Sequence, residues 1–476
     1  MSSPSHRVAI HWFRRDLRVS DNTALHQAWQ RAEKVVPVYI LSDWEHSHAW
    51  TGPGREHFLC ECLRSLAGNL STLEGRLILR QGAAVDELAK LARETKATAI
   101  FYNRDPDPFG KAIESQLETV AEELGLELCP CDDVSMHRFD ETTKDDGTAY
   151  RVYTPYSKRW LNLEKRAPVP KPERLNTPES IPSLPLPTLE TWQLSLPGHA
   201  DFLPGGEKAA RERLTAAVDE RLTLYAELRD APAAEATSRL SQDLRWGTIS
   251  IRTVYERARH AQGAASSGTV KDSFQKYIKE LAWRDFYLHL LEAFPEVLET
   301  EFNPDYRNLP WDEPGDSFEA WKAGRTGFPI VDAGMRELLT TGFIHNRVRM
   351  IVAMFLTKDL HLDWRLGEQH FAQHLLDGEI ASNNGGWQWS AGTGADAAPY
   401  FRIQNPWTQS ARHDPKGDYI KRWVPELASV PASKLHAPPE AGPLASSYPV
   451  PILDHGRERD RTLAIFKKHR EEIGKA

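Results

Sequence analysis

Short apolar runs alternate with amphipathic segments along the first 130 residues of the chain. The runs with the length of buried strands are residues 8–13, 35–41, 77–79, 99–102 and 126–129. Between them, apolar side chains recur at helical spacing, as over residues 58–73 and 85–92. Strands that alternate with helices predict a parallel sheet covered by helices. In such a sheet, the crevice at the carboxyl ends of the strands is the usual ligand site.

The loop after the first predicted strand contains arginines and lacks glycine. Arg14, Arg15 and Arg18 lie in this loop. Without glycines, the backbone cannot bring a pyrophosphate close to a helix N-terminus, so we do not expect a dinucleotide there. The three arginines fit a salt-bridged loop and direct contacts to a ligand equally well.

A proline-rich segment separates this region from a predominantly helical one. Residues 167–187 contain seven prolines, and proline removes a backbone donor and prevents helix continuation. We therefore expect a stiff connector between two domains. Helical spacing then recurs over residues 209–229, 251–261, 270–294, 330–340, 347–360 and 367–376. These patterns predict an α/β domain over residues 1–135, a linker over residues 136–204 and an all-α domain over residues 205–476.

Composition is typical of a soluble globular protein. The 476 residues are 40% hydrophobic and 26% charged, with a formal net charge of −8. No run approaches the roughly 20 apolar residues of a membrane span, so a cytoplasmic protein without membrane contact is expected. The negative charge excludes a uniformly basic surface, and any binding of nucleic acid must be local. The four cysteines form two C-x-C pairs, which is not zinc-site spacing, so we expect free thiols and no metal.

Tryptophan is unusually frequent, with 15 copies. A group of five within about 60 residues comprises Trp364, Trp387, Trp389, Trp407 and Trp423. A core explains single tryptophans, whereas this density raises the question of stacking or electron transfer.

Two segments of the helical region combine hydroxyl, carboxylate and aromatic groups. Residues 237–241 place hydroxyls and amides ahead of a helix, where they can bind phosphate, although an ordinary N-cap explains the same pattern. Helical spacing puts Glu280, Trp283 and Arg284 on one face. A carboxylate beside an indole suits an unstacked base, which it can bind at the edge while the ring stacks. For this segment alone, a solvated Glu280–Arg284 pair is the preferred interpretation.

Two further segments are harder to explain by core packing. Asn346, Arg349 and Met350 share a helix face that offers an amide, a guanidinium and a thioether, while Arg347 points elsewhere and could hold a phosphate. In residues 377–389, two glycines stand between an asparagine pair and two tryptophans. Glycines there permit close approach of the backbone to a flat ligand.

At these residues the chain resembles the DNA photolyase and cryptochrome family over essentially its full length. The similar segments are His11-Trp12-Phe13-Arg14-Arg15-Asp16-Leu17-Arg18, Asn346-Arg347-x-Arg349-Met350, Asn383-Asn384-Gly385-Gly386-Trp387-Gln388-Trp389 and Tyr400-Phe401-Arg402-Ile403. Met350 stands where members that repair cyclobutane pyrimidine dimers carry Met and (6-4) photolyases carry His. The subtype therefore resembles a bacterial cyclobutane pyrimidine dimer photolyase.

The resemblance implies a Rossmann-like α/β domain and a helical domain that holds a U-shaped, fully reduced FAD beneath a cavity for a flipped-out dimer. Light would drive an electron from the flavin to the dimer, and the electron would return after the ring splits. By family position, the cofactor-binding residues would be Tyr225, Thr237, Ser238, Arg239, Leu240, Ser241, Arg284, Arg349, Asp377, Gly378, Glu379 and Asn383. Asn383 would face flavin N5, and Asp377 would pair with Arg349.

The same resemblance implies catalytic roles and DNA contacts. The catalytic residues would be Glu280, Asn346, Met350, Asn383, Trp387, Trp364 and Trp311, the last three as a relay that reduces the flavin photochemically. The residues that contact damaged DNA would be Arg229, Glu280, Trp283, Asn346, Arg347, Met350, Trp389 and Gln409. A basic face would comprise Arg347, Arg349, Arg402, Arg412, Lys416, Lys421 and Arg422. The family expectation is a monomer that binds DNA containing pyrimidine dimers.

Three positions depart from the family pattern. Gln242 stands where many members have Pro, Glu379 where Asp is usual, and Gln404 where Phe is usual. The extra methylene of Glu379 matters most, because it could shift a hydrogen bond near the flavin.

Two questions stay open at this level. Family members often carry a second, light-harvesting chromophore in or beside the α/β domain, and residues 103–110 resemble a segment near that pocket. Methenyltetrahydrofolate is favoured only slightly over 8-hydroxy-deazaflavin. A cryptochrome photoreceptor is the main alternative function and a (6-4) photolyase a weaker one. The residues that together favour repair are Glu280, Trp283, Asn346, Met350 and Trp389.

Overall fold

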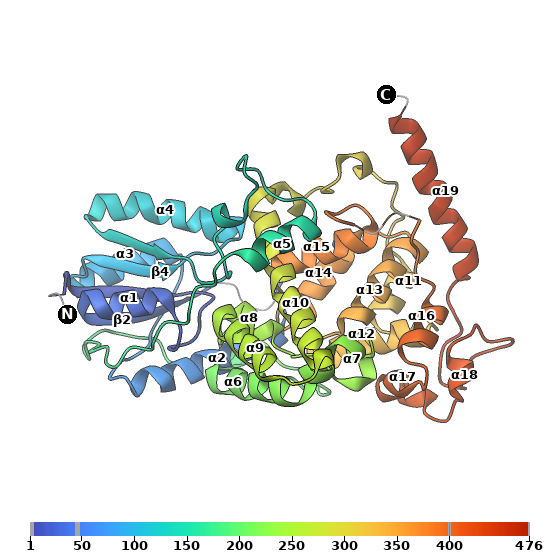
Figure 1. Ribbon diagram of the computed structural model, residues 1–476, viewed down its shortest axis with the longest axis horizontal. Helices are drawn as coiled ribbons and strands as arrows, with labels where there is room; N and C mark the ends of the chain where they lie inside the picture. The colour runs from blue at the N-terminus through green and yellow to red at the C-terminus, as the bar shows by residue number, and fades with distance from the viewer. Residues whose placement is uncertain (1–3, 43–47, 398, 400, 475–476) are drawn as a thin grey trace.

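The computed structural model describes residues 4–42, 48–397, 399 and 401–474. Within these residues, five parallel strands form one sheet in the order β3-β2-β1-β4-β5. The strands are β1 (His6–Phe13), β2 (Ala32–Leu41), β3 (Ile78–Gln81), β4 (Ala99–Asn103) and β5 (Glu127–Cys131). The helices between them are α1 (Thr23–Arg31), α2 (Pro53–Ser71), α3 (Ala84–Thr95) and α4 (Pro108–Leu124). The predicted α/β alternation is confirmed, and Figure 1 shows this domain around the N-terminus.

Strand β1 lies at the centre of the sheet and is buried on both faces. Because side chains alternate along a strand, Ala9 and Phe13 contribute to one core while Ile10 and Trp12 contribute to the other. Helices therefore cover both faces of the sheet, as expected of a parallel sheet.

The segment expected to be a stiff connector between the domains packs against both of them. Helix α5 (Tyr153–Asn162) buries Tyr156 and Trp160 in the core of the helical domain. The proline-rich part then returns along the sheet edge, where the Leu184 amide donates to the Leu79 carbonyl of β3 at 3.0 Å. Proline suits this place, because it has no backbone N–H to donate and therefore prevents a further strand from pairing with this edge of the sheet.

Helices dominate the second domain. They are α6 (Glu207–Ala216), α7 (Tyr225–Leu228), α8 (Ser241–Trp246), α9 (Ile251–Ala264), α10 (Gly268–Ala293), α11 (Asp316–Lys322), α12 (Pro329–Thr341), α13 (Asn346–Met354), α14 (Trp364–His374), α15 (Ile380–Ala391), α16 (Pro406–His413), α17 (Asp418–Trp423), α18 (Ala432–Leu435) and α19 (His455–Ile473). Figure 1 shows them packed around α10 and α15, with α19 at the far end. In the ranges that the structure describes, none of these helices is both long and apolar enough to cross a membrane.

Three predicted helical or loop segments differ in detail from the structure. The pattern over residues 209–229 is interrupted by a π-helical turn, Ala217–Arg221. The pattern over residues 347–360 ends in a second π-helical turn, Phe355–Asp359. Residues 383–389, where the adjacent asparagines and glycines favour a loop, lie inside α15 (Ile380–Ala391). Local glycines suggested a turn there, but tertiary packing outweighs their low helix propensity.

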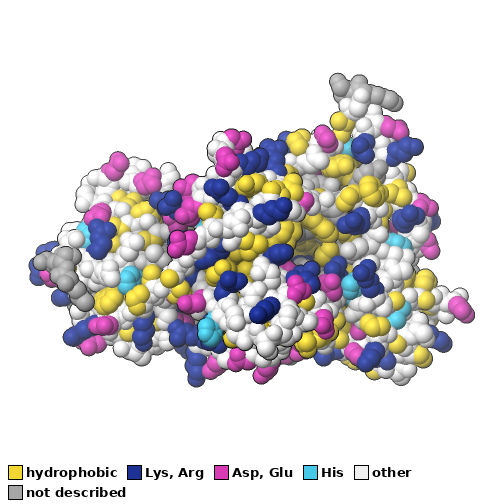
Figure 2. Space-filling model, viewed as in Figure 1, with side chains coloured by type: hydrophobic (Ala, Val, Ile, Leu, Met, Phe, Trp, Pro, Cys, Tyr) yellow, Lys and Arg dark blue, Asp and Glu magenta, His cyan; other side chains and the backbone are white. Residues whose placement is uncertain are grey.

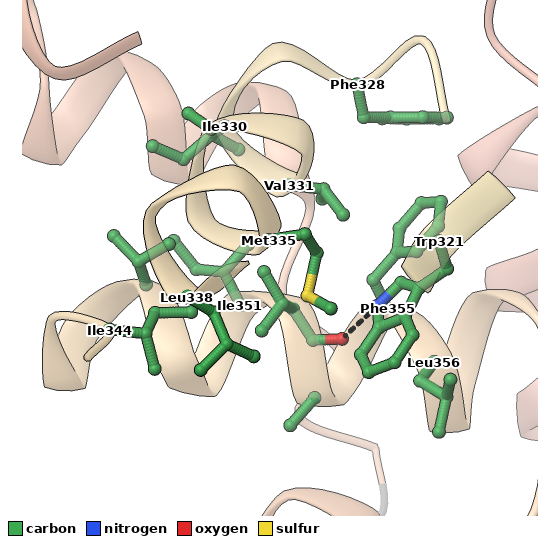
Figure 3. Close-up of a cluster of buried hydrophobic side chains, with 14 of the residues drawn as sticks. Trp321, Phe328, Ile330, Val331, Met335, Leu338, Ile344, Ile351, Phe355 and Leu356 are labelled. Atoms are coloured by element: carbon green, nitrogen blue, oxygen red, sulfur yellow. Dashed lines mark hydrogen bonds between the residues drawn. The ribbon is translucent and has the colours of Figure 1, made fainter. Parts of the chain in front are cut away.

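The largest core of the helical domain lies between α11, α12 and α13 (Figure 3). Trp321 of α11 is fully buried, and its indole N–H donates to the Val352 carbonyl at 3.1 Å. Met335 and Ile351 pack in the same cluster. Because α13 turns Val348 and Ile351 into this core, Asn346 and Met350 are left on its other side.

The two domains meet where α8 ends against the loop after β1. Gly247 caps α8 with φ of 65°, and a Cβ added there would lie 1.9 Å from the Arg15 carbonyl oxygen. The Leu17 amide donates to the Trp246 carbonyl at 3.1 Å, and the Trp246 indole donates to the Leu376 carbonyl at 3.0 Å. Only glycine fits this left-handed position without moving the loop.

Replacing Gly247 with alanine is expected to lower the free energy of unfolding by about 2–4 kcal/mol, through left-handed strain and overlap with the neighbouring backbone. Denaturant unfolding of the purified protein measures this change. Gly263 of α9 is the matched control, because a Cβ added there meets nothing within 4 Å. Gly263→Ala should be neutral or slightly stabilising, and equal losses in both variants would contradict the packing argument.

All four cysteines, Cys60, Cys62, Cys129 and Cys131, are free and buried. Burial raises the pKa of Cys60 and of Cys131 to about 12 in each case. The thiols therefore stay protonated near neutral pH, and protonated thiols are poor nucleophiles.

Candidate functional site: a flavin cradle beneath a charged opening

Helix α15 presents an amide, a glycine and two tryptophans to the interior of the helical domain. Asn383 is buried and donates from Nδ2 to the Glu368 carbonyl at 2.9 Å. Its Oδ1 is buried without a hydrogen-bond partner among the described residues. Gly386 follows one turn later, and a Cβ added there meets nothing within 4 Å. This face therefore combines open space with an unpaired acceptor, which suits a ligand that donates a hydrogen bond.

The other predicted glycine of this helix has a packing role. A Cβ on Gly385 would lie 2.2 Å from the ring of Tyr287 on α10. Gly385 thus lets α15 and α10 approach closely, while Gly386 faces open space. The sequence pattern predicted one role for both glycines, and the structure separates them.

Contacts between separate elements join the predicted cofactor residues into one wall. Arg349 of α13 lies 3.9 Å from Asp377, so the expected pair is present. Arg284 of α10 lies 3.8 Å from Glu379. Asp377 and Glu379 flank Gly378, whose left-handed backbone (φ of 40°) lets it pack on a neighbouring guanidinium. These residues form the side of the site nearest the α/β domain.

The hydroxyl-rich residues 237–241 form the facing side. Residues 237–240 precede α8 as expected, with Leu240 at its N-cap position, and the exposed Ser241 is the first residue of the helix. Arg239 takes a left-handed conformation and lies 3.8 Å from the centre of the Phe343 ring. Burial raises the pKa of Tyr277 to about 12, and a hydrogen bond with Ser238 partly offsets this rise. The segment thus joins α10 to the turn before α13.

Tyr225 completes this side from α7. It is buried, and its ring lies edge-on to Tyr277 with 5.7 Å between ring centres. Burial raises the pKa of Tyr225 far above its ordinary value, so its hydroxyl stays protonated. A protonated tyrosine hydroxyl can donate to a phosphate oxygen.

Glu379 links the site to the α/β domain. Its carboxylate is bound by Arg15 and lies near Arg284. Burial acts to raise its pKa, but Arg15, Arg245 and Arg284 outweigh burial and lower the pKa below the usual value. The longer side chain of glutamate, compared with the usual aspartate, therefore reaches an arginine of the other domain.

The three arginines after β1 are salt-bridged, as one of the two interpretations of that loop predicts. Arg14 pairs with Glu114, and Arg18 pairs with Asp133. Arg15 also binds Asp105 at 2.9 Å. Asp105 belongs to the segment that resembles an antenna-pocket region, so part of that segment is held by internal ion pairs.

A carboxylate–guanidinium pair lies at the opening of the site. Arg229 Nη1 donates to Glu280 Oε1 at 2.7 Å, and both side chains are more than one third exposed. Burial raises the pKa of Glu280, while Arg229 acts to lower it. The solvated Glu280–Arg284 pair considered above is wrong, because Arg284 points inward and donates to the Val134 carbonyl at 2.8 Å.

A second pair lies beside the first on the rim. Arg347 Nη2 donates to Asp230 Oδ1 at 2.8 Å, and its Nη1 lies 3.9 Å from the Met350 sulfur. His413 of α16 contacts the Asp230 carbonyl at 3.0 Å. This brings α16, which carries the half-buried Gln409, to the same rim. Asn346 is exposed at the start of α13.

Figure 2 shows a hollow in this face of the helical domain, with apolar side chains inside it and Lys and Arg side chains near its edge. Exposed members of the predicted basic face are Arg402, Arg412, Lys416 and Arg422. Arg349 is an exception, because it turns inward to Asp377. Tyr400, the first residue of one family-like segment, lies outside the described residues.

Aromatic rings line one side of the opening. Trp283 is half-buried and stacks on Tyr153 of α5, with ring centres 3.6 Å apart and planes within 8°. Sequence reasoning missed Tyr153, because it fell in the segment interpreted as a linker. Trp389 is half-buried on α15, one turn after Gly386. Flat side chains at both places can hold an unstacked base.

Two tryptophans of the predicted relay lie on the consecutive helices α14 and α15, and the third lies in the loop before α11. Trp387 of α15 packs against Gly367 of α14, where a Cβ would lie 2.1 Å from its ring. Trp364 begins α14 and is fully buried. Trp311 is half-buried, and the next residue is bridged to Leu362, just ahead of α14. The predicted relay therefore runs from the buried Trp387 and Trp364 to Trp311, which is partly exposed to solvent.

The residues present fit an FAD. Buried side-chain atoms without a partner in the part of the chain that the structure describes include Asn383 Oδ1 and the Nε atoms of Arg239, Arg245 and Arg349. Such orphaned groups are rare in proteins unless a ligand or water satisfies them. Arginines with hydroxyls suit a pyrophosphate, and an amide acceptor suits a ring N–H. Fold and site together define a protein that binds a nucleotide cofactor beneath a charged, aromatic-lined opening.

Comparison with known proteins identifies the family. The family model described as "DNA photolyase" matches residues 9–173, and the model described as "FAD binding domain of DNA photolyase" matches residues 277–468. The chain belongs to the DNA photolyase family. A "Deoxyribodipyrimidine photo-lyase" of Agrobacterium fabrum is 40% identical, covering 96% of this chain and 97% of the relative.

Solved structures agree with this assignment. A bacterial class III photolyase from Agrobacterium tumefaciens superposes with a TM-score of 0.90 at 38% identity, covering 99% of both chains. An archaeal photolyase from Sulfolobus tokodaii, described with two FAD molecules, has a TM-score of 0.84 at 33% identity, covering 97% of this chain and 100% of that one. A cryptochrome from Synechocystis has a TM-score of 0.88 at 29% identity, covering 98% and 100% respectively.

Proposed function

We propose that this chain splits cyclobutane pyrimidine dimers in DNA with light, using a reduced FAD held in the helical domain. The observation that carries this proposal is the Arg229–Glu280 pair at 2.7 Å, placed at an aromatic-lined opening beside the flavin cradle. A photoreceptor needs a flavin but has no need of a carboxylate and a base-stacking tryptophan at that opening. The bound flavin would supply one electron to the lesion under light and take it back afterwards.

The residues of the cradle have distinct tasks in this proposal. Residues 237–241 and Tyr225 would hold the pyrophosphate arm with hydroxyl and backbone donors. Asn383 would accept a hydrogen bond from the flavin ring through its unpaired Oδ1. Asp377 and Arg349 would form a fixed ion pair beside the flavin ring. Because this pair is already in place, it need not rearrange when the charge of the ring changes.

DNA binding would exchange one ion pair for another. A phosphate at the rim competes with Glu280 for Arg229, and a second phosphate competes with Asp230 for Arg347. Once Arg229 has moved, Glu280 loses the cation that holds its pKa down, while burial and the DNA around it favour the protonated form. A protonated Glu280 can donate a hydrogen bond to a carbonyl of the dimer and stabilise the extra charge there.

Base flipping explains how the lesion would reach this opening. A dimer distorts its duplex, so extruding it costs less than extruding a stacked pair. Trp283, held flat by Tyr153, and Trp389 would then replace the lost stacking. Phosphate contacts at the rim predict that affinity falls as salt rises, because bound counterions are released.

Two further functions of the chain belong to the proposal. Trp387, Trp364 and Trp311 would carry electrons from the surface to an oxidised flavin. A second, light-harvesting chromophore in or beside the α/β domain would be methenyltetrahydrofolate or 8-hydroxy-deazaflavin. Release of bound chromophores by mild denaturation, followed by mass spectrometry, distinguishes these two from a second flavin.

The deciding experiment is a repair assay on an oligonucleotide with one thymine cyclobutane dimer. Purified protein reduced with dithionite should restore the undamaged absorbance under blue light and leave the dimer intact in darkness. An oligonucleotide carrying a (6-4) photoproduct should remain unrepaired. A protein that binds FAD yet leaves both lesions unchanged under light would instead be a photoreceptor.

A further inference from the structure

The middle tryptophan of the relay lies between a carboxylate and a guanidinium. Trp364 is fully buried, and its Nε1 donates to Glu301 Oε1 at 3.2 Å. Arg365 lies over the same ring, with its guanidinium carbon 4.5 Å from the ring centre. Arg365 Nη1 is also 3.2 Å from Glu301 Oε1, and Glu301 is only 4% exposed. Opposite charges thus act on one indole from its N–H edge and from its face.

The neighbouring members of the relay lack this arrangement. The Trp387 indole N–H is buried and has no acceptor in the residues described. Its ring packs edge-on against Phe371, with ring centres 4.9 Å apart. Trp311 is half-buried, so its surroundings include water. Among the two buried tryptophans of the relay, Trp364 therefore contacts a carboxylate, and the Trp387 indole N–H has no acceptor among the described residues.

The guanidinium over Trp364 is itself bound by two carboxylates. Arg365 is bound by Asp363 at 3.0 Å as well as by Glu301. Two carboxylates thus surround one guanidinium. In an interior of low polarity, a nearby negative charge stabilises a positive charge that develops on a ring, and a hydrogen bond to a charged acceptor is stronger than one to a neutral acceptor.

We propose that Glu301 is a positioning residue of the electron relay, which stabilises the one-electron-oxidised form of Trp364 through the indole hydrogen bond. Electron transfer from Trp364 to Trp387 then becomes favourable. The positive charge moves to Trp364, farther from the flavin, before the electron on the flavin can return to Trp387. This inference rests on the relay given under the proposed function, and it adds the residue that sets the direction of electron flow.

The electrons and protons balance in this sequence. With FAD bound and under light, Trp387 would give one electron to the flavin, Trp364 would give one to Trp387, and Trp311 would give one to Trp364. A small-molecule thiol would then give one electron to Trp311 and lose its proton to water, and two of the resulting thiyl radicals would combine to a disulfide. Each indole ends in its starting state, and the Trp364 proton stays in the hydrogen bond with Glu301.

Two variants with opposite charge changes test the proposal. Glu301→Gln keeps the shape and an amide oxygen acceptor but removes the negative charge. It should shorten the lifetime of oxidised tryptophan in transient absorption and lower the rate of flavin photoreduction by about tenfold. Arg365→Gln removes the cation over the ring and should lengthen that lifetime. A merely structural role would move both variants in the same direction.

Controls separate this inference from the relay itself. Trp364→Phe should abolish photoreduction, and if it does not, the relay assignment is wrong. If Trp364→Phe abolishes photoreduction while Glu301→Gln matches the wild type, or if both charge variants shift the lifetime alike, the role of Glu301 is overturned. Repair by dithionite-reduced Glu301→Gln should equal that of the wild type.

A measurement without flavin chemistry checks the hydrogen bond directly. Ultraviolet resonance Raman spectra report the strength of indole N–H hydrogen bonds. The component lost in Trp364→Phe should be the one that shifts to a weaker bond in Glu301→Gln. If Glu301→Gln folds poorly, as judged by FAD content, the lifetime in Arg365→Gln still decides the sign of the effect.

Discussion

Replacing Trp387 with phenylalanine is expected to slow light-driven reduction of oxidised flavin by about 100-fold, which corresponds to a barrier about 2.7 kcal/mol higher. Trp387 is 2% exposed and lies on the same helix as Asn383, which faces the cradle. Phenylalanine gives up an electron far less readily than indole, so the first step of the relay would fail. Absorbance of the oxidised flavin under blue light, with a thiol present, follows the reaction.

Trp192 provides the matched control for this substitution. It is 1% exposed, but it lies in the core of the α/β domain. Trp192→Phe removes an equally buried indole and should leave photoreduction within about twofold of the wild type, because it changes no member of the relay. Equal slowing in both variants would show a general packing effect and contradict the relay.

Much of the fold could be predicted because its signals are local. The five strands come from short apolar runs such as residues 8–13, bounded by amphipathic segments. The docked path of residues 167–187 could not be predicted, because proline content reports stiffness and not what the segment packs against. The helical conformation of residues 383–389 could not be predicted from the sequence for a related reason. Gly385 favours a turn locally, and only the contact with Tyr287 explains its place in a helix.

The composition of the site was easier to predict than its pairings. The residue types at Asp377 and Arg349 were enough to expect their pair through family resemblance. The partners of Glu280 and Arg347 depend on α7, which follows an interruption in a predicted helix. Tyr153 carried no signal in the sequence, because nothing near it along the chain indicates a stack on Trp283. Long-range contacts of this kind need the fold.

Glu280 should contribute to dimer splitting mainly as a hydrogen-bond donor. Glu280→Ala is expected to lower repair per absorbed photon by about threefold to tenfold, which corresponds to the ordinary net value of one hydrogen bond. Glu280→Gln keeps an amide donor at the same reach and should lose less than Glu280→Ala. Repair under continuous blue light, with dithionite-reduced protein saturated by dimer-containing oligonucleotide, gives both values.

The pH dependence of repair gives an independent check on Glu280, with a defined sign. Burial raises the pKa of this carboxyl, and loss of Arg229 to a phosphate removes the interaction that lowers it. Wild-type repair should therefore fall as pH rises through the pKa of Glu280 in the complex, because the donor proton is lost. Glu280→Gln has no such proton and should show a flat profile over the same range.

A matched carboxylate outside the opening completes the test. Glu235 pairs with Arg422 at the surface, and both side chains are exposed. Glu235→Ala should leave repair within about twofold of the wild type, as expected of an exposed ion pair. If Glu280→Gln lost as much as Glu280→Ala while Glu235→Ala had no effect, the negative charge of Glu280 would be the required feature. The proposal that Arg229 leaves Glu280 to bind a phosphate would then be wrong, because it predicts that Glu280 is neutral and donates a hydrogen bond in the complex.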